Sequence, residues 1–468
     1  MDVAKPIEGA PEVCALGADR LRRAFAARKL SPVEVAEACL SRAEAINPKF
    51  NAFTLVDHER AIAAARAAEA RWQRGEPLSP VDGIPATLKD IVWVKGWSVR
   101  YGSRTTSAAP YAEDAPSVAF MRDKGIVFIG QTTTPEFGWK AVTDGPLSGI
   151  TRNAWNPAMT SGGSSGGAAV AAATGAGVFH LGTDGGGSIR VPSAFNGITG
   201  LKPTFGRVPA FPASAFGTVA HIGPMTRRVA DAAAMLAAMS GRSMKDWAQG
   251  PALLPPLGPV EDMLAGARIG YWREPPCGRL DAEVAAAVDA AAQRLAMLGC
   301  RVEPAALPGK DHLEIFDTLW FSGAAARLAA VATDERALVD PGLLETAALG
   351  ARFSAVDLVS AQTRRAEFGA AMDDLLSRYD FLISPATSIP AFAAGQELPD
   401  DSYSGRWTQW AGFNFPINLS QQPALTVPCG RTAAGLPVGL QIVGARGADA
   451  RVLGAGLLYE AAFPEYFI

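Results

Sequence analysis

Cysteine and histidine are scarce in this chain of 468 residues, and their scarcity argues against several kinds of site. The five cysteines form no CxxC pair, and an odd, scattered set is typical of reduced thiols in the cytoplasm rather than of a disulfide framework. The histidines, cysteines and carboxylates do not cluster at the spacing of metal ligands. We therefore expect a cytoplasmic protein without a bound metal ion.

Neither charge nor hydrophobicity is concentrated in long runs. Lys and Arg number 43 and Asp and Glu 46, a net charge of −3, and no five like charges follow one another. This balance gives no basic footprint for nucleic acid or for an anionic membrane. The most apolar stretch, residues 166–182, is rich in Gly and Ala and contains His180, so we expect a buried helix that leads into a strand rather than a membrane span. Residues 1–6 lack the apolar core of a secretory signal.

Hydrophobic residues make up 49% of the chain and charged residues 19%, enough to build a large core. Short apolar runs alternate with segments of helical periodicity, which predicts an α/β sheet covered on both faces. No repeat and no shift in composition indicates a domain boundary. The expected strands cover residues 86–94, 126–129, 178–182, 268–271, 381–383, 424–427 and 438–443. The expected helices cover residues 31–45, 59–74, 116–124, 227–240, 281–298 and 355–378.

Two clusters of glycine and serine flank an Ala-rich stretch. Residues 160–167 read TSGGSSGG, and residues 182–190 read GTDGGGSIR. Glycines in such numbers mark backbone that needs positive φ or lies close to a ligand. A serine in such a turn can present its hydroxyl beside free backbone N–H groups, which are the parts of a nucleophile and its oxyanion hole. One cluster alone also fits an ordinary turn, but two together with a candidate base upstream indicate an active site.

The candidate base is Lys89, because none of the histidines (His58, His180, His221, His312) lies in a motif with a recognisable partner. Lys89 ends the sequence GIPATLK, an apolar run typical of a strand. Burial removes the hydration of a lysine, lowers its pKa and leaves a neutral amine that can accept a proton. Without the serine clusters, a lysine reaching out from an edge strand would be the better interpretation.

These motifs resemble those of the amidase signature family, whose members use a Ser–cis-Ser–Lys triad on an α/β fold. Residues 83–90 resemble its lysine motif, residues 160–207 its glycine–serine block, and residues 418–428 and 435–439 its C-terminal segment. The separations, 75 residues from Lys89 to Ser164 and 24 from Ser164 to Ser188, agree with the family's spacing. The resemblance implies one amidase domain over residues 1–468 with a central mixed sheet. Its signature region covers about 80–210, and its variable pocket region about 300–420.

The resemblance also implies a role for each motif residue. Ser188 attacks the carbonyl carbon, while Ser164, after a cis peptide bond, relays the proton to Lys89, which returns it to the leaving amine. The oxyanion hole is formed by the backbone N–H groups of Gly185, Gly186, Gly187 and Ser188. The supporting residues are Ser165, which hydrogen-bonds to the triad, and Asp184 and Arg190, which brace the loop.

The implied reaction is hydrolysis of a carboxamide C–N bond through an acyl-enzyme on Ser188. Gly185 stands where the glutaminase component of tRNA-dependent amidotransferases often has Thr, which favours stand-alone amidases, including those that act on aryl or nylon-oligomer amides. Two alternatives stay open: the glutaminase (A) subunit of such an amidotransferase, and one component of an amidohydrolase that is built from several chains and needs a partner protein. A homodimer or a small accessory subunit is also left open.

Other motifs give weaker alternatives. Gly162, Ser164 and Gly166 also satisfy G-x-S-x-G, the nucleophile elbow of α/β-hydrolases, which needs a downstream Asp and His, and His312 is the best candidate. That interpretation leaves Lys89 and the Ser188 cluster without a purpose. No phosphate-binding loop or dinucleotide fingerprint is present, so we expect no cofactor.

The substrate pocket is the least determined part. Residues 386–406 are rich in Pro, Gly and Asp over a length that predicts a lid or pocket wall. No arginine stands out as an anchor for a carboxylate, which favours a neutral amide as substrate. The aromatic candidates for the wall, each of which equally fits core packing, are Trp97, Tyr101, Trp407, Trp410, Phe413 and Phe415.

Overall fold

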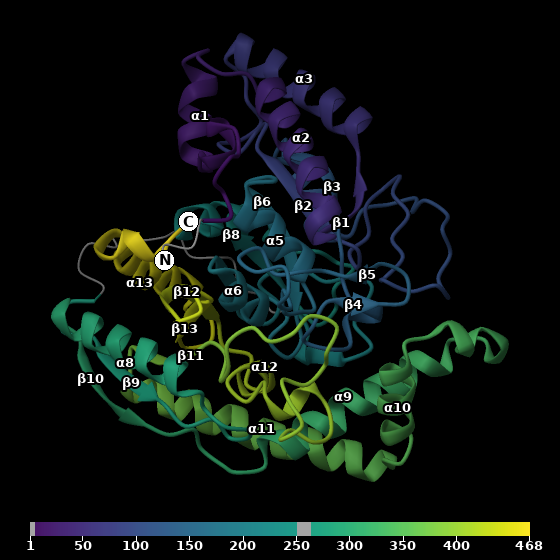
Figure 1. Cartoon of the computed structure of the whole chain (residues 1–468), viewed down its shortest axis with the longest axis vertical. Helices are drawn as coiled ribbons and strands as arrows, with labels where there is room; N and C mark the ends of the chain where they lie inside the picture. Colours follow the sequence, from purple (N-terminus) through teal and green to yellow (C-terminus); the bar gives the residue numbers. More distant parts are fainter. Residues whose placement is uncertain (1–4, 250–263) are drawn as a thin grey trace.

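The computed structural model of the chain describes residues 5–249 and 264–468, and within them one mixed sheet of 11 strands forms the centre of the molecule (Figure 1). Its strands lie in the order β1-β3-β2-β6-β8-β7-β12-β13-β11-β9-β10. They are β1 Phe53–Val56, β2 Pro85–Lys89, β3 Val127–Thr132, β6 Phe179–Asp184, β7 Thr199–Lys202, β8 His221–Thr226, β9 Arg268–Trp272, β10 Arg301–Ala305, β11 Phe381–Pro385, β12 Ala424–Arg431 and β13 Pro437–Val443. A separate pair consists of β4 Asp144–Gly145 and β5 Gly149–Ile150.

Helices cover both faces of the sheet, as the sequence predicts. Gly439 in β13 packs against Ala194 of α6, whereas Leu425 in the neighbouring β12 packs against Gly456 of α13. Helices α5 and α6 therefore lie on one face, and α7, α8 and α13 lie on the other. The helices are α1 Ala18–Ala26, α2 Pro32–Phe50, α3 His58–Arg74, α4 Pro116–Asp123, α5 Gly166–Thr174, α6 Arg190–Asn196, α7 Val229–Met239, α8 Ala282–Met297, α9 His312–Ala329, α10 Pro341–Gly350, α11 Ala355–Arg378, α12 Phe415–Leu419 and α13 Asp449–Ala462.

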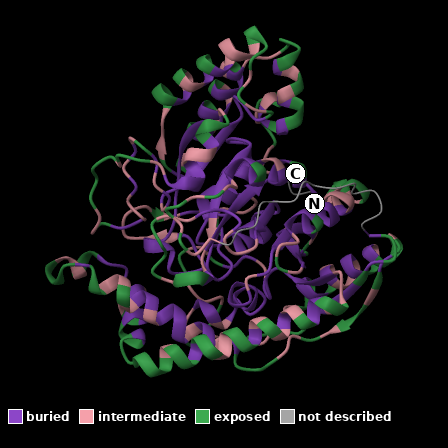
Figure 2. Ribbon diagram, turned by 180° about the vertical axis from the view of Figure 1, so that it is seen from behind, coloured by how far each residue is buried: buried purple, intermediate pink, exposed green. Residues whose placement is uncertain are grey.

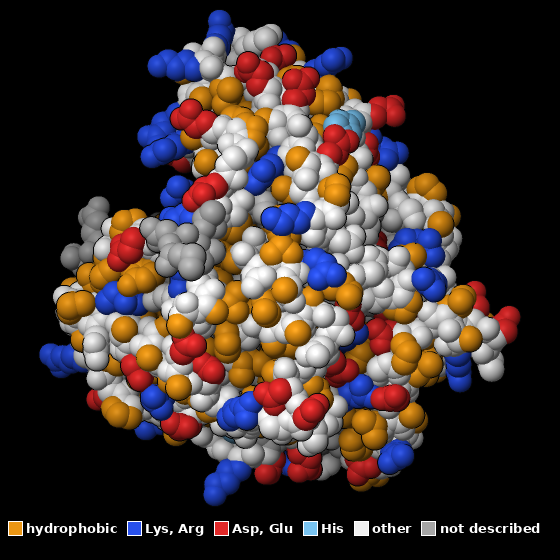
Figure 3. Space-filling model, viewed as in Figure 1, with side chains coloured by type: hydrophobic (Ala, Val, Ile, Leu, Met, Phe, Trp, Pro, Cys, Tyr) orange, Lys and Arg blue, Asp and Glu red, His pale blue; other side chains and the backbone are white. Residues whose placement is uncertain are grey.

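The central strands of the sheet and helices α5 and α6 are deeply buried, whereas β10 at one edge is largely exposed (Figure 2). Every residue of α5 is buried, and α5 is followed by β6, so the expected buried helix leading into a strand is confirmed. Within the described residues, no helix has both the length and the apolar character needed to cross a membrane. On the face shown in Figure 3, Lys and Arg side chains are interspersed with Asp and Glu.

The strand that carries Lys89 is shorter than predicted. The sequence predicts a strand over 86–94, but β2 ends at Lys89. The buried Asp90 carboxylate accepts the backbone N–H groups of Arg100 at 2.7 Å and Gly102 at 3.1 Å, which turns the chain out of the sheet. Apolar residues 91–94 continue the hydrophobic pattern of the strand without its geometry. The prediction for 90–94 was therefore wrong.

The topology brings three segments of the candidate site to one edge of the sheet. Strands β2 and β6 are parallel neighbours, with Leu88 opposite Leu181. Lys89 and Asp184, the last residues of these strands, therefore lie on the same side of the sheet, at the carboxyl ends of the strands. Ser165 directly precedes α5, and Ser188 lies two residues before α6. Both glycine–serine clusters are thus turns at this edge, which is where ligands bind in open α/β sheets.

Candidate active site

Lys89 is fully buried, and its side-chain nitrogen lies among three hydroxyl groups. Its Nζ is 2.6 Å from Ser164 Oγ, 2.9 Å from Ser165 Oγ and 2.9 Å from Thr183 Oγ1. Burial holds the pKa of Lys89 well below its ordinary value of 10.5, and the charge of Asp184 only partly opposes this effect. A neutral amine is the form that such an environment favours.

The hydroxyl of Ser165 is held in one orientation by its neighbours. It donates to the backbone carbonyl of Thr183 and accepts the backbone N–H of the same residue, both at 3.2 Å. With its proton used in this way, Ser165 Oγ acts as an acceptor toward Lys89 Nζ. Thr183, which no sequence motif singled out, is thus part of the lysine site through both its backbone and its side chain. Its only sequence signal is its place directly before Asp184 in the second cluster.

Ser164 and Ser188 both line the same cavity, and each is nearly buried. The peptide bond between Gly163 and Ser164 is cis, as the resemblance implied. Gly163 is needed at this position because a Cβ atom there would lie 2.5 Å from the carbonyl carbon of Val142. The Ser188 carbonyl accepts the backbone N–H of Ser165 at 3.1 Å, so the two glycine–serine turns are joined directly.

Asp184 and Arg190 form a buried ion pair that holds the Ser188 loop. Arg190 donates to both carboxylate oxygens of Asp184 at 2.9 Å, and Asn418 donates to Oδ1 at 2.9 Å. Burial alone would raise the pKa of Asp184, but Arg190, together with the hydrogen bond from Asn418 and the charge of Lys202, holds the pKa below its ordinary value. Arg190 also donates to Gln441 Oε1 at 2.8 Å, which ties the loop to β13. The two charges are thus paired and hydrogen-bonded, as burial requires.

One of the four predicted oxyanion donors is already occupied. The backbone N–H of Gly187 donates to Asp184 Oδ1 at 2.8 Å, inside the turn. In this structure the carboxylate that braces the loop accepts that N–H, and a role for Gly187 in the oxyanion hole stays a prediction. Gly185, Gly186 and Ser188 are the other candidate donors.

The four histidines make hydrogen bonds to groups other than Lys89, Ser164 and Ser188. The ring of His312 bonds to the Pro308 carbonyl at 2.8 Å, and that of His180 bonds to Thr87 Oγ1 at 2.8 Å. His221 bonds to the Val219 carbonyl at 2.8 Å, and His58 lies at the surface against Glu44. The nucleophile-elbow interpretation with His312 as base is wrong, because the hydrogen bond of the Ser164 hydroxyl is to Lys89.

A cavity of about 470 Å³ opens over Ser164, Thr183, Gly185 and Ser188. Most of its wall is apolar and is formed by residues 203–222, by the turn after β2 and by α9. None of residues 386–416 lines it, so the prediction that this loop forms the wall was wrong. Its lining rings include Tyr101, Phe137, Phe205, Phe211, Phe216 and Trp320.

The predicted wall residues after 386 belong to the core instead. Trp407 and Trp410 are buried, and Trp407 packs edge-on against Phe316 with ring centroids 5.9 Å apart. A Cβ atom at Gly186 would lie 2.6 Å from the Trp407 ring, so these aromatics support the Ser188 loop from beneath. Phe413 and Phe415 are buried in the same hydrophobic cluster.

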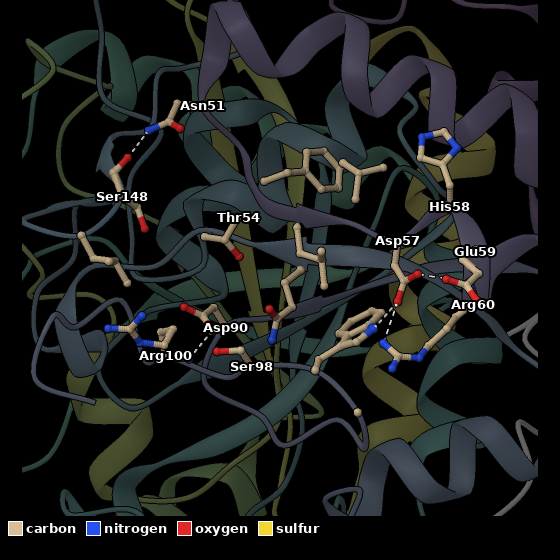
Figure 4. Close-up of a pocket in the computed structure, with 17 residues that line it drawn as sticks. Asn51, Thr54, Asp57, His58, Glu59, Arg60, Asp90, Ser98, Arg100 and Ser148 are labelled. Atoms are coloured by element: carbon tan, nitrogen blue, oxygen red, sulfur yellow. Dashed lines mark hydrogen bonds and ion pairs between the residues drawn. The ribbon is translucent and has the colours of Figure 1, made fainter. Parts of the chain in front are cut away.

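Trp97 lies at a second cavity of about 720 Å³, which shares no lining residue with the first (Figure 4). Its indole N–H donates to Asp57 Oδ2 at 2.6 Å, beside the edge strand β1. The prediction that Trp97 is a wall of the substrate pocket was therefore wrong, whereas Tyr101 does line the cavity over Ser188. Within residues 5–249 and 264–468, no group of three His, Cys, Asp or Glu side chains is placed to hold a metal ion.

Comparisons with known proteins agree with this geometry. Residues 34–453 match the family described as Amidase. The chain is 34% identical over 461 residues to an acylamidase of Rhodococcus erythropolis, with 96% of each chain covered. It is 35% identical over 465 residues to the A subunit of the glutamyl-tRNA(Gln) amidotransferase of Anaeromyxobacter sp. (strain K), covering 93% of this chain and 94% of the other.

Solved structures show the same fold. A bacterial aryl acylamidase superposes with a TM-score of 0.88 at 27% identity, covering 96% of this chain and 97% of the other. A 6-aminohexanoate cyclic dimer hydrolase superposes with a TM-score of 0.86 at 27% identity, covering 97% and 98%. The chain belongs to the amidase signature family. It is a hydrolase that acts on amide bonds.

Proposed function

We propose that this protein is a stand-alone amidase in which Ser188 is the nucleophile, Ser164 the proton relay and Lys89 the base. The observation that carries this proposal is the burial of Lys89 Nζ among three hydroxyl oxygens, with Ser164 the nearest at 2.6 Å. A surface lysine would be charged and could accept no proton at neutral pH. Burial lowers the pKa of Lys89 and so favours the neutral amine, which is able to act as a base.

In the proposed mechanism Lys89 is a neutral amine, and its three contacts can be assigned accordingly. An uncharged amine has two N–H donors and one lone pair. Ser165 Oγ accepts one N–H, since its own proton is donated to the Thr183 carbonyl. Thr183 Oγ1 accepts the other, which leaves the lone pair of Nζ to accept the proton of Ser164. Ser164 Oγ is then free to accept the proton of Ser188.

The reaction follows from this chain of hydroxyls. Ser188 Oγ attacks the carbonyl carbon while its proton moves to Ser164, and the proton of Ser164 moves to Lys89. The charged Lys89 then returns a proton through Ser164 to the nitrogen of the leaving amine, and the C–N bond breaks to give an ester on Ser188. A water molecule, activated by the same relay, hydrolyses this ester and releases the carboxylic acid.

The oxyanion of the tetrahedral intermediate is stabilised by backbone N–H groups of Gly185, Gly186 and Ser188. Each such donor contributes about 3 kcal/mol to transition-state stabilisation. Asp184 and Arg190 do not react but hold the turn that orients these N–H groups. The Asp184 carboxylate is joined to the turn by the hydrogen bond that it accepts from the Gly187 N–H.

The cavity favours an amide with an apolar part. The rings of Phe216 and Trp320 stack with centroids 3.8 Å apart and form one wall beside Gly185. Such a wall buries aromatic or aliphatic surface at about 25 cal/mol per Å². Amides with an aryl or alkyl group are therefore the proposed substrates, in agreement with the similarity of the chain to an acylamidase and an aryl acylamidase.

A second candidate, the glutaminase component of a tRNA-dependent amidotransferase, is favoured by one observation: the chain is about as similar to such proteins as to the acylamidase. Association with a partner protein or as a homodimer, and a cytoplasmic location, stay predictions. Turnover by the purified chain alone separates the two functions. We expect hydrolysis of aryl and alkyl amides without any added protein. Hydrolysis of glutamine only, and only after addition of a partner protein, would favour the amidotransferase component.

A further inference from the structure

Helix α9 runs along the active-site cavity and presents three residues to it or to its wall. Trp320 and Arg327 line the cavity, and Gly323 between them packs against the backbone of Ala215 and the ring of Phe216. The spacing of three and four residues places all three on one face of the helix. Trp320 contacts Gly185 in the candidate oxyanion turn, and Arg327 lies seven residues further on, about 10 Å along the helix axis.

Arg327 differs from the other charged groups of this cavity. Lys245 is paired with Glu113 at 2.6 Å, and Asp246 accepts the backbone N–H of Ala210 at 2.8 Å. Among the described residues, no carboxylate lies within ion-pair distance of Arg327. The nearby Glu136 has its own partners, because it accepts the Ser103 hydroxyl at 2.5 Å and the Asp340 N–H at 2.6 Å.

Aromatic rings hold the guanidinium of Arg327 in place. It lies over Phe137, 4.0 Å from the ring centroid, and 5.4 Å from the centroid of Tyr101. Both rings also line the cavity. A guanidinium held by its face keeps its N–H edge available, and that edge matches the two oxygens of a carboxylate. Partial burial makes an unpaired charge here costly unless a ligand supplies the opposite charge.

Building on the proposed amidase function, we infer that Arg327 is a specificity residue that binds an anionic group of the substrate. The substrates are amides with an apolar body that carry a carboxylate or similar anion remote from the bond that is cleaved. The apolar body lies against Phe216 and Trp320, and the anion reaches Arg327 at the far end of the α9 face. The sequence favours a neutral amide, since no arginine stands out in it as an anchor. The structure shows that Arg327, which no motif marks, lines the cavity.

The test compares matched substrates. One series consists of 4-nitroanilides of dicarboxylic acids of increasing length, with a free terminal carboxylate, each paired with its terminal carboxamide. A second series carries the carboxylate on the amine half, as N-acyl ω-amino acids paired with the ω-amino amides. We expect one series to show kcat/KM about tenfold or more higher for the carboxylate than for its neutral partner at the best length. Arg327→Gln should abolish this preference through KM, and Arg327→Lys should retain part of it.

Controls separate this inference from the proposed reaction. Lys245→Gln should keep the carboxylate preference, because Glu113 already neutralises Lys245. Binding of the same carboxylates to Ser188→Ala, measured by calorimetry with and without Arg327→Gln, reports the anion site without turnover. Equal selectivity in wild type and Arg327→Gln, or a preference for the neutral partner throughout, overturns the inference while leaving amide hydrolysis by Ser188 intact. If no amide is turned over, the proposed function fails and the binding measurement alone decides on Arg327.

Discussion

Gly185 and Trp320 are packed so closely that a Cβ atom on Gly185 would lie 2.8 Å from Cζ3 of the indole ring. Trp320 has little room to move, because its ring stacks on Phe216 and its Nε1 donates to the Trp139 carbonyl at 2.9 Å. We predict that Gly185→Ala displaces the candidate oxyanion turn and lowers kcat by about tenfold or more, since overpacking costs about 1–3 kcal/mol. Steady-state kinetics on any turned-over amide measure this loss.

A second substitution shows whether the contact is the cause. Trp320→Leu in the Gly185→Ala background should restore part of kcat. Gly369→Ala in α11 is a matched control, because nothing lies within 4 Å of its added Cβ, and it should leave kcat unchanged. An undiminished kcat in Gly185→Ala would show that the turn tolerates a side chain and that Trp320 does not limit it.

The pH dependence of activity reports the protonation of Lys89. The pKa of Lys89 in the folded protein is lowered well below 10.5 by burial, so the neutral, active form increases as pH rises through that lowered value. We predict that kcat/KM rises with pH and becomes level well below pH 10.5. A profile that climbs without levelling up to the ordinary lysine value would show that Lys89 is not held neutral.

Stability should depend on pH through the same group. Between the lowered pKa and 10.5, the unfolded chain binds a proton on Lys89 that the folded chain does not bind, so the stability contributed by this residue rises with pH. We predict that wild type gains stability relative to Lys89→Met by up to about 1.4 kcal/mol per pH unit in this window. Urea unfolding of both proteins at several pH values measures the difference. A difference independent of pH would contradict burial of a neutral lysine.

The Asp184–Arg190 pair should matter for both folding and activity. We predict that Asp184→Asn costs about 3–5 kcal/mol of unfolding free energy, because it leaves Arg190 buried without its counter-charge. It should also lower kcat, since Asp184 orders the Gly187 N–H. Asp82→Asn is the control, because Asp82 is a buried partner of Arg71 that does not line the cavity. It should destabilise the protein but leave the kcat of the folded enzyme unchanged. Equal effects of both variants on kcat would remove the special role of Asp184.

Local sequence patterns predicted the candidate triad of the site. The GIPATLK run and the two glycine–serine clusters carry their own backbone signals, so Lys89, Ser164 and Ser188 could be named before their geometry was known. The cavity wall could not be predicted in this way. Trp320 and Arg327 are far from the motifs in sequence, and only the docking of α9 on the loop after β7, which carries Phe216, brings the three residues together. Nor could the sequence show that the Gly187 N–H donates to the Asp184 carboxylate inside the turn.

The most direct test of the proposed mechanism is to locate the acyl group during turnover. Rapid acid quenching of the enzyme with an activated amide or ester, followed by proteolysis and mass spectrometry, identifies the residue that carries it. The mechanism predicts one ester, on the peptide that contains Ser188, absent in Ser188→Ala and much slower to form in Lys89→Met. An acyl group on Ser164, or one that still forms at the wild-type rate without Lys89, would contradict it.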